Sequence, residues 1–477
     1  MKKLALTLFV VLATIANASA QSFEAECPSG QTLKFKVIDS ENLHVKVDSR
    51  NDVTGILEIP ETVTHNSRNY IVTRIGNSAF SPNNPSHHGP RSVTLPGTIT
   101  CIESYAFENC ENLLEINMPT SIDSIFSYAF YGCEKLTSIT IPSSVKFLGS
   151  DIFRSCDRLT TVYYNAIDCN EAIWPFRGCH FTELILSDSI VRIPGYTFYC
   201  SNIAGHIELP KSLSYIGHSA FGECDSITSV SIPQNLDTIE FSFNGCDNID
   251  TVFYNAINAF TFPYLALGAF TLSGVRTIIF GENVERLPAY IFCQCTNIDS
   301  LSLPNSLKRI EDYAFCSCTS LTNLTIPENV EYIGNFAFYD CPNITSMNLK
   351  PITPPEIFQN TFHEVPTDIP ITIPCHSDYP NAPYWSNFTN FIEDCDAVDE
   401  NEVEENAIVY PNPVLDVLHI DGKNLYRIEI VNSIGQIIET FACDKDETAI
   451  DMSQYQPGLY LIRMIGESSI SKQIIKL

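Results

Sequence analysis

The chain has 477 residues, 44% of them hydrophobic, and a formal net charge of -29 at pH 7. This length exceeds that of one ordinary globular domain, and the apolar fraction allows a large buried core. The acidic charge repels nucleic acid and anionic membrane surfaces, so we expect no nucleic-acid partner.

Residues 1–20 have the pattern of a secretory signal peptide. Lys2 and Lys3 precede a nearly continuous apolar run, and Ala18-Ser19-Ala20 supplies the small residues that signal peptidase requires. We expect cleavage after Ala20. The alternative is a membrane anchor, but neither this run nor any later one has the roughly 18 to 20 apolar residues that a spanning helix needs. We therefore expect no transmembrane segment in the mature chain.

Residues 21–51 are expected to form an N-terminal β cap. Apolar residues alternate with polar ones at Leu33, Phe35 and Val37, a period typical of a half-buried strand. A stacked repeat needs a cover for the open end of its first coil, and an amphipathic hairpin supplies one. A disordered leader is the alternative.

An internal repeat occupies residues 52–374. Shifted by 23 residues, the stretch 292–341 superimposes phenylalanine on phenylalanine and cysteine on cysteine (Phe292, Phe315 and Phe338; Cys295, Cys318 and Cys341). A period of about 20 to 29 residues with L-x-x-L-x-L spacing is the signature of a leucine-rich-repeat solenoid. We predict about 12 to 14 coils of 22 to 24 residues that stack into a curved parallel β-sheet, because one coil cannot enclose a core alone.

Each coil also contributes a phenylalanine to a row on the wall opposite to the predicted strands. These side chains have a structural explanation and need no ligand: Phe80, Phe107, Phe130, Phe153, Phe176, Phe198, Phe221, Phe243, Phe270, Phe292, Phe315, Phe338 and Phe362.

Cysteines follow this row at a fixed distance. They lie three residues after a row phenylalanine, with Cys200 one place out of register: Cys110, Cys133, Cys156, Cys179, Cys224, Cys246, Cys295, Cys318 and Cys341. We expect buried free thiols, because in-register side chains point the same way and fit disulfide geometry poorly; cross-coil disulfides are the alternative. Cys375 and Cys395 bracket a segment outside the repeat and form a candidate disulfide.

The repeat unit A-F-x-x-C-x-x-L-x-x-I-x-I-P-x-S-V-x-x-I-G resembles the BspA-like leucine-rich repeat of bacterial surface proteins. The segment 375–395, with Tyr384-Trp385 and Phe388, resembles the irregular element that ends such arrays. The resemblance implies a role in adhesion to host matrix proteins or to other cells, and it implies no shared catalytic residue. It does not name a ligand.

The C-terminal region contains an acidic linker and a further domain. Residues 375–407 comprise the C-terminal cap and the linker, and residues 408–477 show short alternating strands that predict a small β-sandwich. Tyr410-Pro411-Asn412-Pro413 and Pro457-Gly458-Leu459-Tyr460 resemble blocks of the type IX secretion C-terminal sorting domain. That resemblance implies handling by the type IX machinery of a Gram-negative bacterium, removal of the domain, and attachment to the cell surface or release. Cys443 has no explanation.

We predict a secreted, surface-displayed binding protein that is not an enzyme. The sequence lacks hydrolase, zinc-protease, phosphate-loop and dinucleotide motifs, so we expect no cofactor and no metal. The partner is expected to be a protein of the host matrix or of a cell surface. A carbohydrate-binding module and a structural surface-layer component are the alternatives.

The candidate binding face is the outward side of the strands, which we expect to be concave. Side chains alternate at period two, so the residues between the buried ones point outward. Tyr163 and Phe253 are large aromatics on a face of small polar residues, which include Thr161, Thr251, Ser229, Ser231, Ser300, Ser302, Asn323 and Thr325. A face that serves only solubility is the alternative.

Overall fold

The computed structural model describes residues 21–48, 53–82, 88–261, 268–395, 407–422, 427–432, 437–442, 447–456, 458–465 and 469–476. The chain divides into two compact units, Met1–Asp394 and Cys395–Leu477. The expected signal segment 1–20 and the linker residues 396–406 lie outside the described residues.

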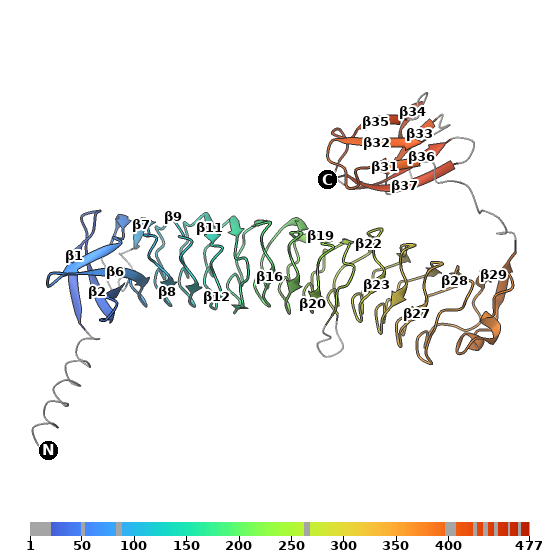
Figure 1. The fold of residues 1–477 in the computed structure, drawn as a ribbon, viewed down its shortest axis with the longest axis horizontal. Coiled ribbons are helices and arrows are strands. Elements are labelled where there is room, and N and C mark those ends of the chain that lie inside the picture. Colours follow the sequence, from blue (N-terminus) through green and yellow to red (C-terminus); the bar gives the residue numbers. More distant parts are fainter. Residues whose placement is uncertain are drawn as a thin grey trace, which may run out of the picture. The chain divides into compact units, whose positions relative to one another are not determined.

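The first unit is a parallel β-solenoid, which confirms the predicted fold (Figure 1). One row of strands bears, on the strands or directly beside them, the residues that were predicted to point outward. It comprises β4 (Gly55–Glu58), β7 (Pro90–Thr94), β9 (Glu115–Ile116), β11 (Ser138–Ile141), β13 (Thr161–Tyr164), β15 (Glu183–Leu186), β17 (Gly205–Glu208), β19 (Ile227–Ile232), β21 (Thr251–Tyr254), β22 (Thr277–Phe280), β24 (Ser300–Leu301), β26 (Asn323–Ile326), β28 (Ser346–Leu349) and β29 (Ile371–Pro374). The row is divided into four sheets, and within each sheet neighbouring coils pair in parallel, for example Val162 with Leu184 and Val230 with Val252.

A second row of short strands, absent from the sequence prediction, forms another wall of the coils. It comprises β6 (Arg68–Ile75), β8 (Cys101–Ile102), β10 (Ser124–Ile125), β12 (Phe147–Leu148), β14 (Glu171–Ala172), β16 (Arg192–Ile193), β18 (Tyr215–Ile216), β20 (Thr238–Ile239), β23 (Arg286–Leu287), β25 (Arg309–Ile310) and β27 (Tyr332–Ile333). Most of these strands have two residues, too few to show an alternation in the sequence. A glycine often follows them because the coils approach closely there: a Cβ at Gly149 would lie 2.3 Å from the backbone nitrogen of Ser127.

The N-terminal end of the solenoid carries β structure. Strands β1 (Ser22–Glu26), β2 (Thr32–Asp39) and β3 (His44–Val47) pair antiparallel, and β3 then pairs in parallel with β6. Strand β5 (Thr62–His65) adds to β6 as an antiparallel hairpin. Leu33, Phe35 and Val37 point into the core, so alternation along β2 covers the end of the first coil.

The predicted row of phenylalanines forms one uninterrupted stack through the core. From Phe80 to Phe362 successive ring centroids lie 5.0 to 5.7 Å apart. Rings such as Phe130 are completely buried. Offset stacking suits the ring quadrupole and adds to the gain from burying the ring, so each coil is stabilised by both of its neighbours.

The row cysteines have a function that we did not predict. The Sγ of each donates a hydrogen bond to the carbonyl oxygen of a phenylalanine in the preceding coil; from Cys133 to Phe107 the distance is 3.2 Å. All nine are free thiols, and burial raises the pKa of Cys295 to about 12. Cys200 is exposed, and Ser201 takes the row position, donating to Phe176 at 3.3 Å. The thiols are therefore donors as well as small apolar groups.

The C-terminal end of the first unit is covered by strand β30 (Phe391–Asp394) and two 3-10 turns, η1 (Tyr379–Asn381) and η2 (Trp385–Asn387). Trp385 packs on Phe362, the last ring of the stack, and its Nε1 donates to the Pro355 carbonyl at 2.9 Å. Cys375 and Cys395 are each disulfide-bonded. That they pair with each other stays our prediction.

The second unit has two antiparallel sheets around a separate apolar core, as predicted for a small β domain. One sheet contains β31 (Ala407–Tyr410), β32 (Val417–Gly422) and β35 (Glu447–Asp451). The other contains β33 (Arg427–Asn432), β34 (Ile437–Ala442), β36 (Gly458–Ile465) and β37 (Ser469–Lys476). Cys443 lies outside the described residues.

Replacement of one ring of the stack should weaken the whole solenoid. Phe130→Ala leaves a cavity between Phe107 and Phe153, and we expect a loss of about 3 to 5 kcal/mol in the free energy of unfolding. Tyr163→Ser, at an exposed position, is the control and should change it by no more than about 0.5 kcal/mol. Urea denaturation followed by circular dichroism measures both. Equal stability of Phe130→Ala and wild type would contradict a stack that holds the coils together.

Candidate functional site

The outward residues of the first row of strands, which is divided into four sheets, lie along one side of the coils, and we call this side the strand face. It consists of the residues on either side of the buried central residue of each strand. All ten predicted face residues lie there, and all are exposed or half-buried. Tyr163 is 40% exposed. The alternation on which the prediction rested therefore holds at these positions.

The structure divides the predicted residues into two groups along the solenoid. Thr161, Tyr163, Ser229, Ser231, Thr251 and Phe253 belong to strands β13, β19 and β21. Ser300, Ser302, Asn323 and Thr325 lie on or beside β24 and β26, where Asn323 accepts a hydrogen bond from Ser346. No large aromatic accompanies the second group at the face positions of β24, β26 and β28. The first group is the candidate site.

At one end of the candidate site, Tyr163 lies beside an exposed isoleucine. It pairs in register with Ile185, which is 39% exposed. On the same two strands, Thr161 donates a hydrogen bond from Oγ1 to the Glu183 carboxylate at 2.9 Å. This end of the site therefore combines an apolar patch with an acidic group.

At the other end, Phe253 lies beside a histidine that sequence reasoning missed. The ring of His206 meets that of Phe253 edge-on, with centroids 5.7 Å apart. His206 Nδ1 lies 2.8 Å from Ser229 Oγ, and its Nε2 lies 3.1 Å from Ser231 Oγ and 3.2 Å from a Glu208 carboxylate oxygen. The hydrogen bond with His206 is the main cause that lowers the pKa of Glu208. This network fixes the polar groups around Phe253.

The two aromatics belong to one surface. In coil order, Ile185, Glu208 and Ser231 separate Tyr163 from Phe253. Among the described residues, no third histidine, cysteine or carboxylate completes a metal-binding cluster around His206 and Glu208. Two ligands are fewer than a zinc site requires. The arrangement suits contact with a partner surface.

A further row of aromatics, half-buried except for the buried Phe241, was not predicted. Two residues before each phenylalanine of the stack, the chain often places another aromatic, and these residues form what we call the aromatic row: Tyr105, Tyr128, Trp174, Tyr196, Phe241, Tyr290, Tyr313 and Phe336. Tyr290, Tyr313 and Phe336 stack with centroids 4.5 and 4.7 Å apart. The fixed offset from the stack was a signal that the sequence contained.

Around Trp174 the aromatic row brings together several types of side chain. Its ring meets Tyr196 edge-on at 5.4 Å, and the Arg177 guanidinium lies 5.9 Å from the ring centroid. Farther along, His218 lies between Tyr196 and Phe241, each 5.3 Å away. Trp174 is half-buried. Tryptophan, tyrosine and arginine are the residue types enriched at the energetic centres of interfaces.

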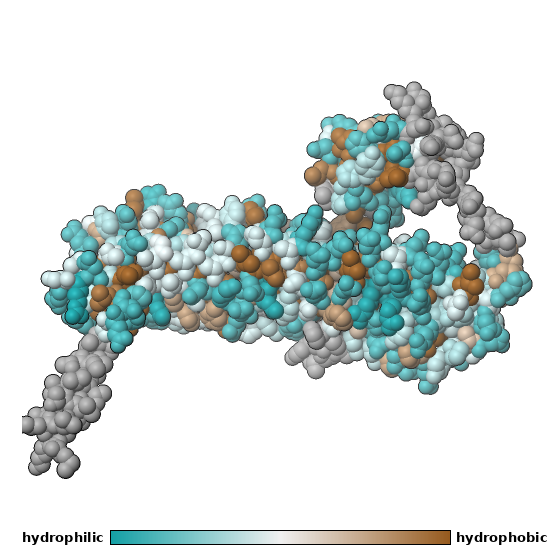
Figure 2. Space-filling model, in the orientation of Figure 1, coloured by the Kyte–Doolittle hydropathy of each residue, from teal (hydrophilic) through white to brown (hydrophobic). Residues whose placement is uncertain are grey.

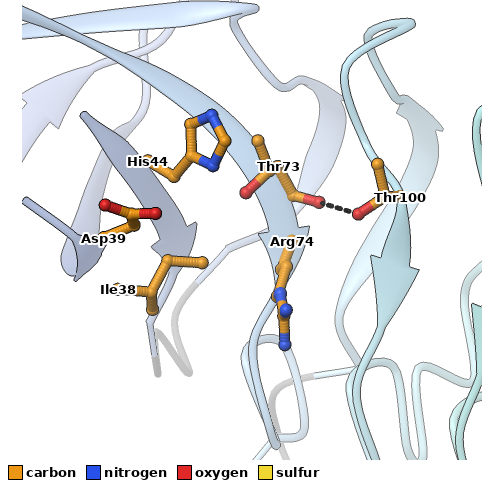
Figure 3. Close-up of a pocket in the computed structure, with 6 residues that line it drawn as sticks. All are labelled: Ile38, Asp39, His44, Thr73, Arg74 and Thr100. Atoms are coloured by element: carbon orange, nitrogen blue, oxygen red, sulfur yellow. Dashed lines mark hydrogen bonds between the residues drawn. The ribbon is translucent and has the colours of Figure 1, made fainter. Parts of the chain in front are cut away.

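A hollow of about 330 Å³ lies beside the N-terminal strands (Figure 3). Its lining residues are Ile38, Asp39, His44, Thr73, Arg74 and Thr100. Hydrogen bonds from Asn42 lower the pKa of Asp39, so this carboxylate is engaged in the β2–β3 turn. In Figure 3, Thr100 donates to the Thr73 carbonyl, and the side chains of Asp39, His44 and Arg74 do not converge on one point. We assign no chemistry to this hollow.

The surface of the first unit has no large continuous apolar area on the side visible in Figure 2, where apolar patches are small and separated by polar ones. Small patches among polar side chains are typical of a surface exposed to water. No helix in the described part of the chain is long and apolar enough to cross a membrane.

Comparison with known proteins identifies the two units. A stacked array of β-coils with an outward-facing strand surface defines a leucine-rich-repeat protein. Three stretches of the chain, residues 62–170, 174–298 and 285–379, match the family described as BspA type leucine-rich repeat region (6 copies), and the chain belongs to this family. Residues 408–476 match the secretion system C-terminal sorting domain. The protein is therefore secreted to the outer surface through type IX secretion.

Several solved structures resemble the chain. A leucine-rich cell surface protein from Faecalibacterium prausnitzii A2-165 has 24% identity, a TM-score of 0.36, and coverage of 70% of this chain and 96% of its own. A leucine-rich repeat protein from Bacteroides ovatus ATCC 8483 has 21% identity and a TM-score of 0.40, and the match covers 76% of this chain and 98% of that protein. The pneumococcal vaccine antigen PcpA has 18% identity and a TM-score of 0.38, and the match covers 78% of this chain and 99% of that protein. No curated protein matches the chain.

His218, which packs between two residues of the aromatic row, should be harder to protonate than a free histidine. Burial lowers the pKa of His218, although Glu240 opposes this effect. The unfolded chain therefore binds a proton at His218 more readily than the folded chain does. The contribution of neutral His218 to the free energy of unfolding is complete above about pH 6.5 and is lost as the pH falls through the pKa of the folded state. We expect an NMR titration midpoint for His218 below about 6.5. A midpoint above that value would show that the ring is not shielded; His218→Gln should remove the assigned signal and this part of the pH dependence.

Proposed function

We propose that this protein is a non-catalytic adhesin that binds a protein of the host matrix or of a neighbouring cell through the strand face. One observation carries the proposal: Tyr163 and Phe253 stand on a surface made otherwise mostly of small hydroxyl and amide side chains. Tyr163 is exposed and Phe253 is half-buried. Solubility alone would not select large aromatics there, and aromatic residues are common anchors of interfaces.

We do not propose a hydrolase site at the hydrogen-bonded series Ser229, His206 and Glu208. Strand β19 lies between β17 and β21, so its backbone N–H groups serve the sheet ladder. A serine nucleophile needs free donors that converge on the developing oxyanion. The series instead fixes the orientation of His206 beside Phe253, which supports a binding role.

Glycan binding is the second candidate function, and the aromatic row favours it. Trp174, Tyr196 and Arg177 offer ring and guanidinium groups on a wall different from the strand face. A glycan array distinguishes the two candidates: binding that Trp174→Ala abolishes and that strand-face variants leave intact would support the glycan function.

The main proposal predicts a large effect from two small changes. A pull-down of host and microbial extracts with the purified full chain first identifies the partner. We expect Tyr163→Ser/Phe253→Ser to weaken its binding by at least about 2 kcal/mol, because two anchors are lost. The melting temperature should hardly change, since neither ring belongs to the buried stack. Unchanged affinity of the folded double variant, measured by calorimetry, would remove the strand face from the interface.

Processing is a further expectation of the proposal. The form displayed at the cell surface should begin at Gln21 and lack most of residues 409–477, because both end segments have the pattern of export signals. Mass spectrometry of protein released from the surface measures both ends. Peptides that end at Leu477 in that fraction would contradict removal of the second unit.

A further inference from the structure

The strand face is unusual in its charge. From β4 to β28 its positions include the carboxylates of Glu58, Glu115, Glu183 and Glu208, and none of them is a lysine or an arginine. All of these strands belong to the described part of the chain. No lysine or arginine on the face itself is available to neutralise these carboxylates, although His206 on the face and Lys211 beside it act on Glu208 and lower its pKa. Its potential is therefore negative, in addition to the net charge of the whole chain.

The second row of strands has the opposite character. There Arg192 lies over the Tyr215 ring at 3.8 Å and Arg309 lies over the Tyr332 ring at 3.9 Å. Arg286 donates to the Glu311 carboxylate at 2.8 Å. The chain thus places cations on one wall, where they meet aromatic and acidic neighbours within the protein, and keeps them off the strand face. Whether a coil carries a lysine or an arginine at a given point therefore depends on whether that point belongs to the strand face or to the second row.

Two of the face carboxylates lie within the candidate site. Glu183 on β15 and Glu208 on β17 follow one another along the solenoid, between Tyr163 on one side and Phe253 on the other. Both are exposed, with 63% of the Glu208 side chain accessible. Glu183 accepts from the Thr161 hydroxyl and Glu208 contacts His206. Neither forms an ion pair with a lysine or arginine of the described residues.

We propose that the strand face recognises a basic segment of its protein partner, whose lysine or arginine side chains bind at Glu183 and Glu208 while flanking apolar side chains contact Tyr163 and Phe253. This inference rests on the proposed function and adds the chemical class of the partner. Carboxylates and cations form charge-assisted hydrogen bonds, and an aromatic ring also attracts a cation placed over its face.

The dimensions of the site set the length of the segment. Tyr163 and Phe253 are four coils apart. Three of these steps join paired strands about 4.8 Å apart, and the step from β15 to β17 joins strands that are not paired, so the span is at least about 19 Å. An extended peptide covers this distance with about six residues at about 3.3 Å per residue. Taken coil by coil, the face offers Tyr163 on β13, Glu183 on β15, Glu208 on β17, the hydroxyl of Ser231 on β19 and Phe253 on β21. A short basic stretch with an apolar residue at each end therefore matches the order aromatic, acidic, acidic, hydroxyl, aromatic.

The test uses the full chain and two synthetic peptides of equal length. One peptide alternates lysine and serine between terminal leucines, and the other has glutamine in place of each lysine. We expect Glu183→Gln/Glu208→Gln to bind the lysine peptide at least about tenfold more weakly than wild type, which is about 1.4 kcal/mol. The glutamine peptide should bind wild type no better than the lysine peptide binds this variant. Fluorescence anisotropy measures each affinity.

A matched control separates local recognition from net charge. Glu282→Gln/Glu328→Gln changes the charge equally in exposed turns and should alter the affinity by less than about twofold. Equal weakening by both pairs, or no weakening by either, would overturn the inference. If the captured partner still depends on Tyr163 and Phe253 while the Glu183→Gln/Glu208→Gln variant binds it normally, the adhesin proposal stands and the basic segment does not.

Discussion

The structure depends on the contact between one coil and the next. A coil of about 23 residues has no interior of its own, so its apolar side chains are buried only when a neighbour covers them. Phenylalanine rings from Phe80 to Phe362 make this contact repeatedly at nearly constant spacing. The nine row thiols each add a hydrogen bond to the backbone of the preceding coil. The two ends must then be covered, by β1–β3 at one and by Trp385 at the other.

In-register stacking also determines the surface. Because every coil repeats the same geometry, a residue at one position of the coil lies beside the same position of its neighbours, and a preference in the sequence becomes a stripe on the molecule. The strand face, the cation-bearing second row and the aromatic row are three such stripes. The aromatic row is formed at a corner where most of its residues, Tyr128 and Tyr313 among them, have positive φ. Ser78 and Ser219 have the same backbone conformation, so the corner requires it whatever the side chain.

The parts of the structure that follow from periodicity could be predicted from the sequence. The phenylalanine period gave the stack, and alternation gave the outward direction of Tyr163 and Phe253. The second row of strands could not be predicted, because two-residue strands show no alternation. The row cysteines were expected to be free and buried, but their role as donors depends on where the phenylalanine carbonyls lie. Ser201 shows the same requirement, since it replaces the displaced Cys200 as the donor.

The candidate site could be predicted only in part, for a similar reason. The predicted face residues did not include His206 and Glu208. These two residues occupy the same positions in the coil as Ser229 and Ser231, with which they pair. Their importance comes from contacts between coils, such as that of His206 with Phe253, which a search within one repeat does not reveal. The aromatic row was not predicted, although its residues lie at a fixed offset of two residues before the buried phenylalanines.

Hydroxyl-radical footprinting of the protein with its captured partner tests the central claim most directly, because one experiment reports on both walls. If the strand face is the binding surface, Tyr163 and Phe253 will be protected from oxidation in the complex, while Trp174 and Tyr196 will react as in the free protein. Protection of Trp174 and Tyr196, with Tyr163 and Phe253 unchanged, would contradict the account and place the partner on the aromatic row.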